Sequence, residues 1–205
     1  MNIRSQDSTS RRKVGRRFGI LAVLVAVFVG SATAAALADK PIIQGGYRLH
    51  WGDNEPNYPR GYVYWLDQTG AAFPVYSSAI EWDKAGKLDA VYTTSSGSCP
   101  ASHCASVINA PLEAGCSPPY GVTDIPWSGP GHFTTGVRVR IDTNCSSRNA
   151  ADRRELVCHE LGHSIGIDDR AASSTSCMRT GNMVGRQLPI DDDYDTLRIS
   201  YSHDS

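Results

Sequence analysis

Residues 159–169 of the 205-residue chain read HELGHSIGIDD. In a helix, residues four apart lie one turn apart on the same face, so the imidazoles of His159 and His163 can converge on one ion. Glu160 lies one residue round the helix from His159, where its carboxylate is too offset to bind that ion readily but can reach a water molecule on it. The spacing therefore predicts a helix that carries two zinc ligands and a general base.

The residues after this helix predict a turn and a third ligand. Gly166 lies three residues after His163, and glycine permits the left-handed backbone conformation in which many helices end. Such a turn directs the following residues back toward the metal, where Asp169 can supply the third ligand. Asp168 competes for this role, and the ten-residue offset from His159 favours Asp169.

HELGHSIGIDD resembles the extended zinc signature of the metzincin peptidases, H-E-x-x-H-x-x-G-x-x-H, with Asp169 in place of the third histidine. Among metzincins, an aspartate there is found in the snapalysin-type small secreted neutral proteases. Residues 176–178 (SCM) resemble the Met-turn that lies under the metal in this clan, so we expect a structural role for Met178. The resemblance implies an α+β, metzincin-like zincin domain with a mixed twisted sheet, an active-site helix, a Met-turn and a C-terminal helix.

Two further segments resemble the matrixin branch. Residues 78–82 (SAIEW) resemble its tryptophan-bearing first helix, and residues 190–201 resemble its closing helix. The chain shows no cysteine-switch propeptide and lacks the usual structural-zinc histidines, and Thr180 stands where astacins and serralysins carry a metal-linked tyrosine. Latency and secondary metals are therefore not carried over. Because an aspartate ligand makes zinc-bound water less acidic than a third histidine would, we expect a pH optimum that is shifted upward.

Residues 1–38 have the layout of a secretory signal peptide. Residues 11–17 read RRKVGRR, residues 18–29 are apolar or small, and residues 36–38 (ALA) fit a signal peptidase site. A membrane span needs about 20 apolar residues, so a secreted product without an anchor is favoured over a single-span protein. The arginine pair before the apolar run is compatible with twin-arginine export and with an ordinary basic signal.

Residues 39–205 form the predicted metallopeptidase catalytic domain. The whole chain has 20 Lys and Arg against 21 Asp and Glu, and six of those bases but one acid lie in residues 1–38. The predicted mature domain is therefore net negative, which gives no support to nucleic-acid binding. With no internal repeat and 40% hydrophobic residues, the chain is typical of one globular domain. We expect a monomer that acts on protein or peptide substrates.

All six cysteines follow the signal peptide, and an even number in an exported chain predicts three disulfides. Fifteen pairings are possible. We favour nearest-neighbour pairing, which joins Cys99 to Cys104, Cys116 to Cys145 and Cys158 to Cys177. No C-x-x-C pair occurs, so the cysteines do not form a zinc ribbon.

The order of hydrophobic patterns predicts the α+β class. The expected elements are two short strands around a loop in residues 47–66, strands at 88–94 and 136–141, a disulfide-pinned loop at 95–131, and helices at 150–165 and 191–201. Ala79, Ile80, Trp82 and Ala85 fit one side of a further short helix. Ser147 or Asn149 is expected to cap the long helix.

Together these features predict a secreted zinc endopeptidase in which a metal-activated water attacks the peptide bond and Glu160 acts as general base. An extended peptide is expected beside residues 136–141 as an edge strand, with a side-chain pocket formed by residues 179–190. The alternatives are an enzyme confined to one partner, such as a processing protease or toxin, and a catalytically silent secreted binding protein. The intact Glu160 argues against the silent protein.

The sequence allows two interpretations of three tryptophans and of one acidic run. Trp51, Trp65 and Trp127 could belong to the core or to a substrate subsite, with the core favoured. The acidic run at residues 191–193 (DDD) could bind calcium, although a solvated helix start is favoured.

Overall fold

The computed structural model describes residues 40–52, 61–112 and 115–202. They all belong to one structural unit, Leu37–Ser205. The predicted signal peptide, residues 1–38, lies outside the described residues. Within the described ranges, no helix has the length and apolar character needed to cross a membrane. These ranges form an α+β fold with a mixed sheet and three α-helices.

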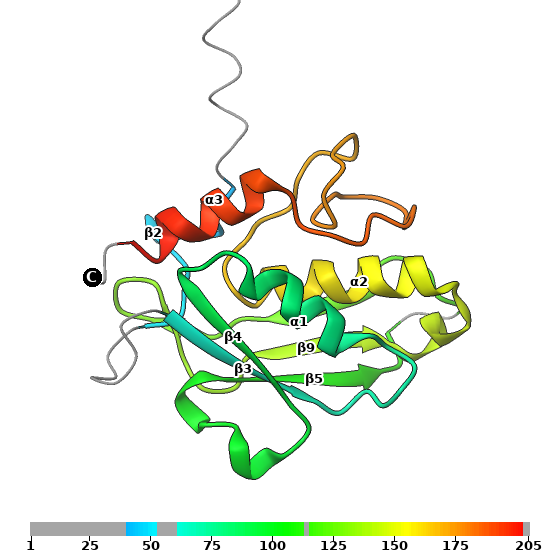
Figure 1. Cartoon of the computed structure of the whole chain (residues 1–205), viewed down its shortest axis with the longest axis horizontal. Coiled ribbons are helices and arrows are strands. Elements are labelled where there is room, and N and C mark those ends of the chain that lie inside the picture. Colours follow the sequence, from blue (N-terminus) through cyan, green and yellow to red (C-terminus); the bar gives the residue numbers. More distant parts are fainter. Residues whose placement is uncertain (1–39, 53–60, 113–114, 203–205) are drawn as a thin grey trace, which may run out of the picture. The chain divides into compact units, whose positions relative to one another are not determined.

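A five-stranded mixed sheet organises the fold (Figure 1). In spatial order its strands are β4 (Leu88–Thr93), β3 (Gly61–Asp67), β5 (Cys104–Ala110), β9 (Arg138–Asp142) and β6 (Gly121–Asp124). The pairings among β4, β3, β5 and β9 are parallel, whereas β6 runs antiparallel to β9. The two edges of this sheet are therefore β4 and β6.

The alternation predicted for residues 136–141 is confirmed, because Val139 and Ile141 of β9 are fully buried whereas Arg138 is exposed. The expectation that this segment is an edge strand is wrong. It pairs with β5 on one side and with β6 on the other. Alternation reports which face of a strand is buried, and it carries no information on whether both hydrogen-bonding edges are paired.

The prediction that residues 95–131 form a disulfide-pinned loop is wrong in part. A disulfide does join Cys99 to Cys104, but the segment also contributes β5 and β6 to the sheet. Ala105 and Val107 of β5 are fully buried between the neighbouring elements. The cysteine, proline and glycine content of the segment is typical of loops, and the two short strands depend on pairing with their neighbours rather than on their own composition.

The α-helices of the described ranges are α1 (Val75–Asp83), α2 (Ala150–His163) and α3 (Asp191–Ser200). In Figure 1, α1 and α2 lie on the same side of the sheet. Of the residues predicted to share one side of the first helix, Ala79 and Trp82 are buried, and so is Ala85 just after the helix. Ile80 is 43% exposed, because it lies about 100° round the helix from Ala79.

The long helix begins where the sequence indicates. The side chain of Asn149, rather than that of Ser147, accepts a hydrogen bond from the backbone N–H of Asp152 at 2.9 Å. The helix ends at His163, two residues before the predicted end. Gly166 has φ of 96°, the left-handed conformation expected for the turn that follows.

The remaining strands and helices of the described ranges are short. They are two antiparallel pairs, β1 (Ile43–Gln44) with β2 (Tyr47–Arg48) and β7 (Trp127–Ser128) with β8 (His132–Phe133), and the 3-10 helices η1 (Ser96–Ser98), η2 (Ala101–His103) and η3 (Thr143–Ser147). The strands expected within residues 47–66 are present as β2 and β3. The loop expected between them falls largely on residues 53–60, outside the described residues.

Three buried tryptophans anchor α2 and the turn after it. The indole N–H of Trp82 donates to the carbonyl of Cys158, and those of Trp51 and Trp65 donate to the carbonyl and the hydroxyl of Ser164, all at 2.9 to 3.0 Å. Trp51 and Trp65 therefore belong to the core rather than to a subsite. These three hydrogen bonds hold α2 at Cys158 and at its C-terminal cap, Ser164.

The three predicted disulfides are present with the predicted pairing: Cys99–Cys104, Cys116–Cys145 and Cys158–Cys177. Three disulfides in one chain of this size are consistent with an extracellular protein. The third bridge joins α2 directly to the segment that contains Met178.

Candidate metal centre

Helix α2 places His159 and His163 one turn apart, with their Nε2 atoms 3.0 Å from each other. The Nδ1 of His159 lies 3.0 Å from the carbonyl oxygen of Cys177, and the Nδ1 of His163 lies 2.8 Å from that of Ile167. Because a carbonyl only accepts hydrogen bonds, each Nδ1 must carry the proton and donate it. Both Nε2 atoms then present lone pairs to the same point, as in histidines that bind a metal.

The turn at Gly166 brings Asp169 to that point. A Cβ atom at Gly166 would lie 2.0 Å from the carbonyl oxygen of Leu49, so glycine is required here for space as well as for its positive φ. The Oδ1 of Asp169 lies 3.3 Å from Nε2 of His159 and 3.6 Å from that of His163. The competing Asp168 turns its carboxylate to the backbone N–H of Asp169 instead.

The three potential ligand atoms have the spacing that a tetrahedral zinc site requires. Their separations are 3.0, 3.3 and 3.6 Å. Ligands at about 2.0–2.1 Å from zinc in a tetrahedral arrangement lie about 3.3–3.4 Å apart. Two imidazoles and one carboxylate also form a donor set that suits zinc. The residues present therefore fit this metal, with a fourth position left for another ligand.

The electrostatics of the cluster favour a positive charge among these atoms. Burial lowers the pKa of His159, but the hydrogen bond and charge of Asp169, the charge of Glu160 and the Cys177 carbonyl outweigh burial and raise it above its ordinary value. The hydrogen bond to His159 lowers the pKa of Asp169 against an opposing effect of burial. The raised pKa of His159 and the lowered pKa of Asp169 both indicate a site that attracts a cation.

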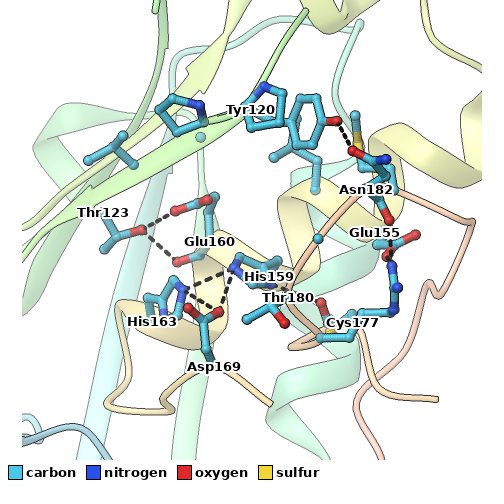
Figure 2. A pocket seen from close by; sticks show the side chains of 18 residues that line it. Tyr120, Thr123, Glu155, His159, Glu160, His163, Asp169, Cys177, Thr180 and Asn182 are labelled. Atoms are coloured by element: carbon cyan, nitrogen blue, oxygen red, sulfur yellow. Dashed lines mark hydrogen bonds and ion pairs between the residues drawn. The ribbon is translucent and has the colours of Figure 1, made fainter. Parts of the chain in front are cut away.

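Glu160 lies beside this cluster, with its carboxylate directed toward β6. Its side chain is buried, and its Oε2 accepts a hydrogen bond of 2.7 Å from the hydroxyl of Thr123 (Figure 2). Gly121 lies against the same side chain. Thr123 and Gly121 are not predicted as site residues from the sequence, because a strand of four residues gives too short a pattern to indicate which helix it faces.

Met178 packs directly against α2, the helix that carries the candidate ligands His159 and His163. It is fully buried, and a Cβ atom at Gly162 would lie 2.2 Å from its Sδ and 2.7 Å from the ring of Trp82. Gly162 therefore permits the close approach of this segment to α2. The adjacent disulfide Cys158–Cys177 fixes the same contact covalently. Met178 lies where the sequence predicts a structural methionine.

The acidic run at residues 191–193 forms the solvated helix start that the sequence favours only in part, because Asp191 is exposed and Asp192 is partly exposed at the start of α3 whereas Asp193 is not. Asp193 is fully buried and forms an ion pair with Arg170. It also accepts hydrogen bonds from the hydroxyl of Ser176 at 2.5 Å and from the backbone N–H of Ile190 at 2.8 Å. The expectation is wrong for Asp193 because its partner, Arg170, is distant in the sequence and a local pattern does not reveal it.

A cavity of about 480 Å³ opens beside the cluster. Residues 118–123, which include part of the edge strand β6 and the segment before it, line the cavity together with residues 179–183, Leu156 and Cys177. Of the predicted pocket at residues 179–190, only residues 179–183 therefore belong to the lining.

Glu155 and Arg179, which are not predicted as site residues from the sequence, stabilise the lining segment at residues 179–183 and the residues that follow it. The buried carboxylate of Glu155 accepts hydrogen bonds from the backbone N–H groups of Val184 and Arg186, both at 2.8 Å. Its other oxygen lies 3.6 Å from Nη1 of Arg179. Glu155 lies one helical turn before His159, so α2 orients both the cluster and the cavity wall.

No known protein family matches the chain, and no curated protein matches it. Function is therefore inferred from the arrangement of the residues themselves. The structure brings together the side chains of His159, His163 and Asp169, places Glu160 next to them, and places Met178 below α2.

Proposed function

We propose that the protein is a secreted zinc-dependent endopeptidase with a metzincin-like catalytic domain. The observation that carries this proposal is the convergence of two Nε2 atoms and one carboxylate oxygen within 4.8 Å of one another, beside a buried glutamate and an open cavity. Chemistry of this kind requires a metal site with a free position, a proton acceptor and space for substrate. The residues that would meet these three requirements lie together beside α2.

His159, His163 and Asp169 would hold the zinc ion. When bound, zinc supplies Lewis acidity toward a peptide carbonyl and makes a water molecule acidic enough to ionise near neutral pH. The His159 and His163 side chains are 20% and 18% exposed, and that of Asp169 is 48% exposed, so the cluster opens toward solvent. That opening leaves room for substrate to enter.

Glu160 moves the protons in the proposed reaction. Its Oε1, the oxygen that is not bonded to Thr123, takes a proton from the water molecule whose oxygen forms the new bond to the carbonyl carbon. The same carboxyl group then delivers that proton to the amide nitrogen as the C–N bond breaks. The products are one carboxylic acid and one amine, and Glu160 returns to its starting form.

The edge strand β6 provides the docking surface for the peptide. Among the described residues β6 pairs only with β9, and an extended substrate can add to its other edge through main-chain hydrogen bonds. β6 carries residues that line the cavity and the residue that bonds Glu160. A peptide on this edge would therefore lie beside the cluster and direct a side chain into the cavity. The proposed docking strand is therefore residues 121–124, in place of residues 136–141, which the sequence suggested for this role.

Other features support the family resemblance and the proposed compartment. The mixed sheet, the buried Met178 under α2 and the closing helix α3 agree with what the resemblance to metzincins implies. The three disulfides and the signal-like residues 1–38 support secretion.

The test compares the exported wild-type protein with Glu160→Ala and with the control Asp195→Ala, which alters an exposed residue of α3. We expect Glu160→Ala to retain zinc and to lose cleavage of casein and of quenched peptides, while the control retains both. Hydrolysis by Glu160→Ala above about one per cent of the wild-type rate would contradict its role as base. A wild-type protein that binds zinc and cleaves nothing would instead favour the silent binding protein.

A further inference from the structure

Two residues of β6 face the helix that carries Glu160. Gly121 pairs with Ile141 and Thr123 pairs with Val139 in the antiparallel register. Directly opposed residues point to the same face of a sheet, and Ile141 and Val139 are fully buried. Gly121 and Thr123 therefore lie on the face that is turned toward the interior.

Gly121 leaves the space that the Glu160 side chain occupies. A Cβ atom at Gly121 would lie 2.6 Å from both Cγ and Oε1 of Glu160, and 2.7 Å from Cδ. Those separations are far inside van der Waals contact, so any larger residue would displace the carboxyl group. Gly121 is not among the residues with positive φ, and its glycine is therefore explained by space rather than by backbone conformation.

Thr123 fixes the orientation of the same carboxylate. Its Oγ1 lies 2.7 Å from Oε2 of Glu160 and 3.0 Å from the backbone carbonyl oxygen of Glu160. A hydroxyl group has one proton, and the nearer, charged oxygen is the stronger acceptor. The hydrogen bond therefore holds Oε2, while Oε1 remains the oxygen that can accept a proton from water.

We propose that Gly121 and Thr123 are positioning residues for Glu160, so that the strand on which the peptide docks also orients the general base. This inference rests on the proposed peptidase function. Figure 2 shows the contact that carries it: the Thr123 side chain reaches toward Glu160 beside the histidine pair. Neither residue needs to contact the reacting atoms, because both act through the Glu160 carboxylate.

The experiment compares Thr123→Val, which keeps the shape but removes the donor, with Thr123→Ser, which keeps the donor. Thr135→Val, an exposed turn threonine, is the matched control. We expect Thr123→Val to lower kcat by about tenfold to a hundredfold, the range for loss of one hydrogen bond to a charged group, with KM within about twofold of wild type. Thr123→Ser should recover kcat to within about threefold, and every variant should bind the same amount of zinc.

Wild-type kcat in Thr123→Val, or a Thr123→Ser variant as slow as Thr123→Val, would overturn the proposal. Crystal structures of the wild type, Thr123→Val and Gly121→Ala provide a readout that does not depend on activity. We expect the Glu160 carboxylate to leave its wild-type position in both variants. If the carboxylate stays in place in both, the positioning role is wrong even when the protein is a peptidase. If the carboxylate moves but the wild type cleaves no peptide, the proposed function fails instead.

Discussion

Arg170 and Asp193 form an ion pair in which the two side chains are 5% and 0% exposed. Arg170 directly follows the candidate ligand Asp169, and Asp193 lies in the first turn of α3. The Ser176 hydroxyl that donates to Asp193 also accepts a hydrogen bond of 2.9 Å from the backbone N–H of Met178. The ion pair therefore joins α3 to the residue next to the candidate ligand Asp169 and to the segment that contains Met178.

Asp193→Ala is expected to destabilise the protein by about 3–5 kcal/mol, because it removes the fully buried carboxylate that pairs with the buried Arg170 guanidinium, and the other acid, Asp192, lies 4.0 Å away and is half-exposed. Urea denaturation measures the free energy of unfolding. The control is Asp195→Ala, which removes an exposed partner of Arg198 on the same helix and should change stability by no more than about 1 kcal/mol. Similar losses in the two variants would show that burial of the Arg170–Asp193 pair is not what makes it important.

Gly162→Ala is expected to destabilise the protein by about 1–3 kcal/mol or more, because the added methyl group overlaps the Met178 sulfur and the Trp82 ring. The same displacement should weaken zinc retention during dialysis. Thermal denaturation and metal analysis check the two effects. Gly97→Ala is the control, since the added methyl group would lie 3.8 Å from the Ser95 hydroxyl oxygen, an ordinary van der Waals contact. A Gly162→Ala protein as stable as the control would mean that Met178 does not pack tightly under α2.

The stability of the protein is expected to fall as the pH rises from 10 to about 12. Burial, followed by the charges of Glu81, Asp193 and Asp191, raises the pKa of Tyr194 to about 12. A tyrosine in the unfolded chain ionises near pH 10, so the neutral phenol favours the folded state below that pH, and this contribution is lost as the pH approaches the folded pKa. Tyr194→Phe should show a shallower decline in this window.

Denaturant unfolding at fixed pH values across this window measures the decline. Tyr194→Phe also loses the hydrogen bond from the Tyr194 hydroxyl to the Glu81 carbonyl, so it should be less stable at neutral pH by about 1 kcal/mol. Tyr76→Phe, which changes an exposed side chain, is the control. Parallel curves for the wild type and Tyr194→Phe between pH 10 and 12 would contradict the assignment.

The sequence predicts well those features that depend on local spacing. The four-residue spacing of His159 and His163 places both on one helix face, and Gly166 indicates the turn that returns the chain toward them. The cap at Asn149, the burial of Val139 and Ile141, and the order of most helices and strands also follow from local patterns. The disulfide pairing was one of fifteen possibilities, and nearest-neighbour pairing proved correct.

Features that depend on distant partners escape sequence analysis. The edge position belongs to β6 rather than to β9, because sheet order is set by pairings between strands and not by the pattern within one strand. The sequence pattern around Asp193 is that of a surface acid, because its partner Arg170 is 23 residues away in the chain. Thr123 and Glu155 read as ordinary polar residues, and their contacts with Glu160 and with the cavity wall emerge only when the elements pack.

Metal analysis of the natively folded, exported protein tests most directly whether the two imidazoles and the Asp169 carboxylate bind one zinc ion. We expect about one zinc ion per chain in the wild type, loss of most of that zinc in His163→Ala, and full retention in the control His132→Ala, which alters a histidine of β8. A wild-type protein that is fully folded and binds no zinc when the metal is supplied would rule out this metal site, as would zinc binding that His163→Ala leaves unchanged.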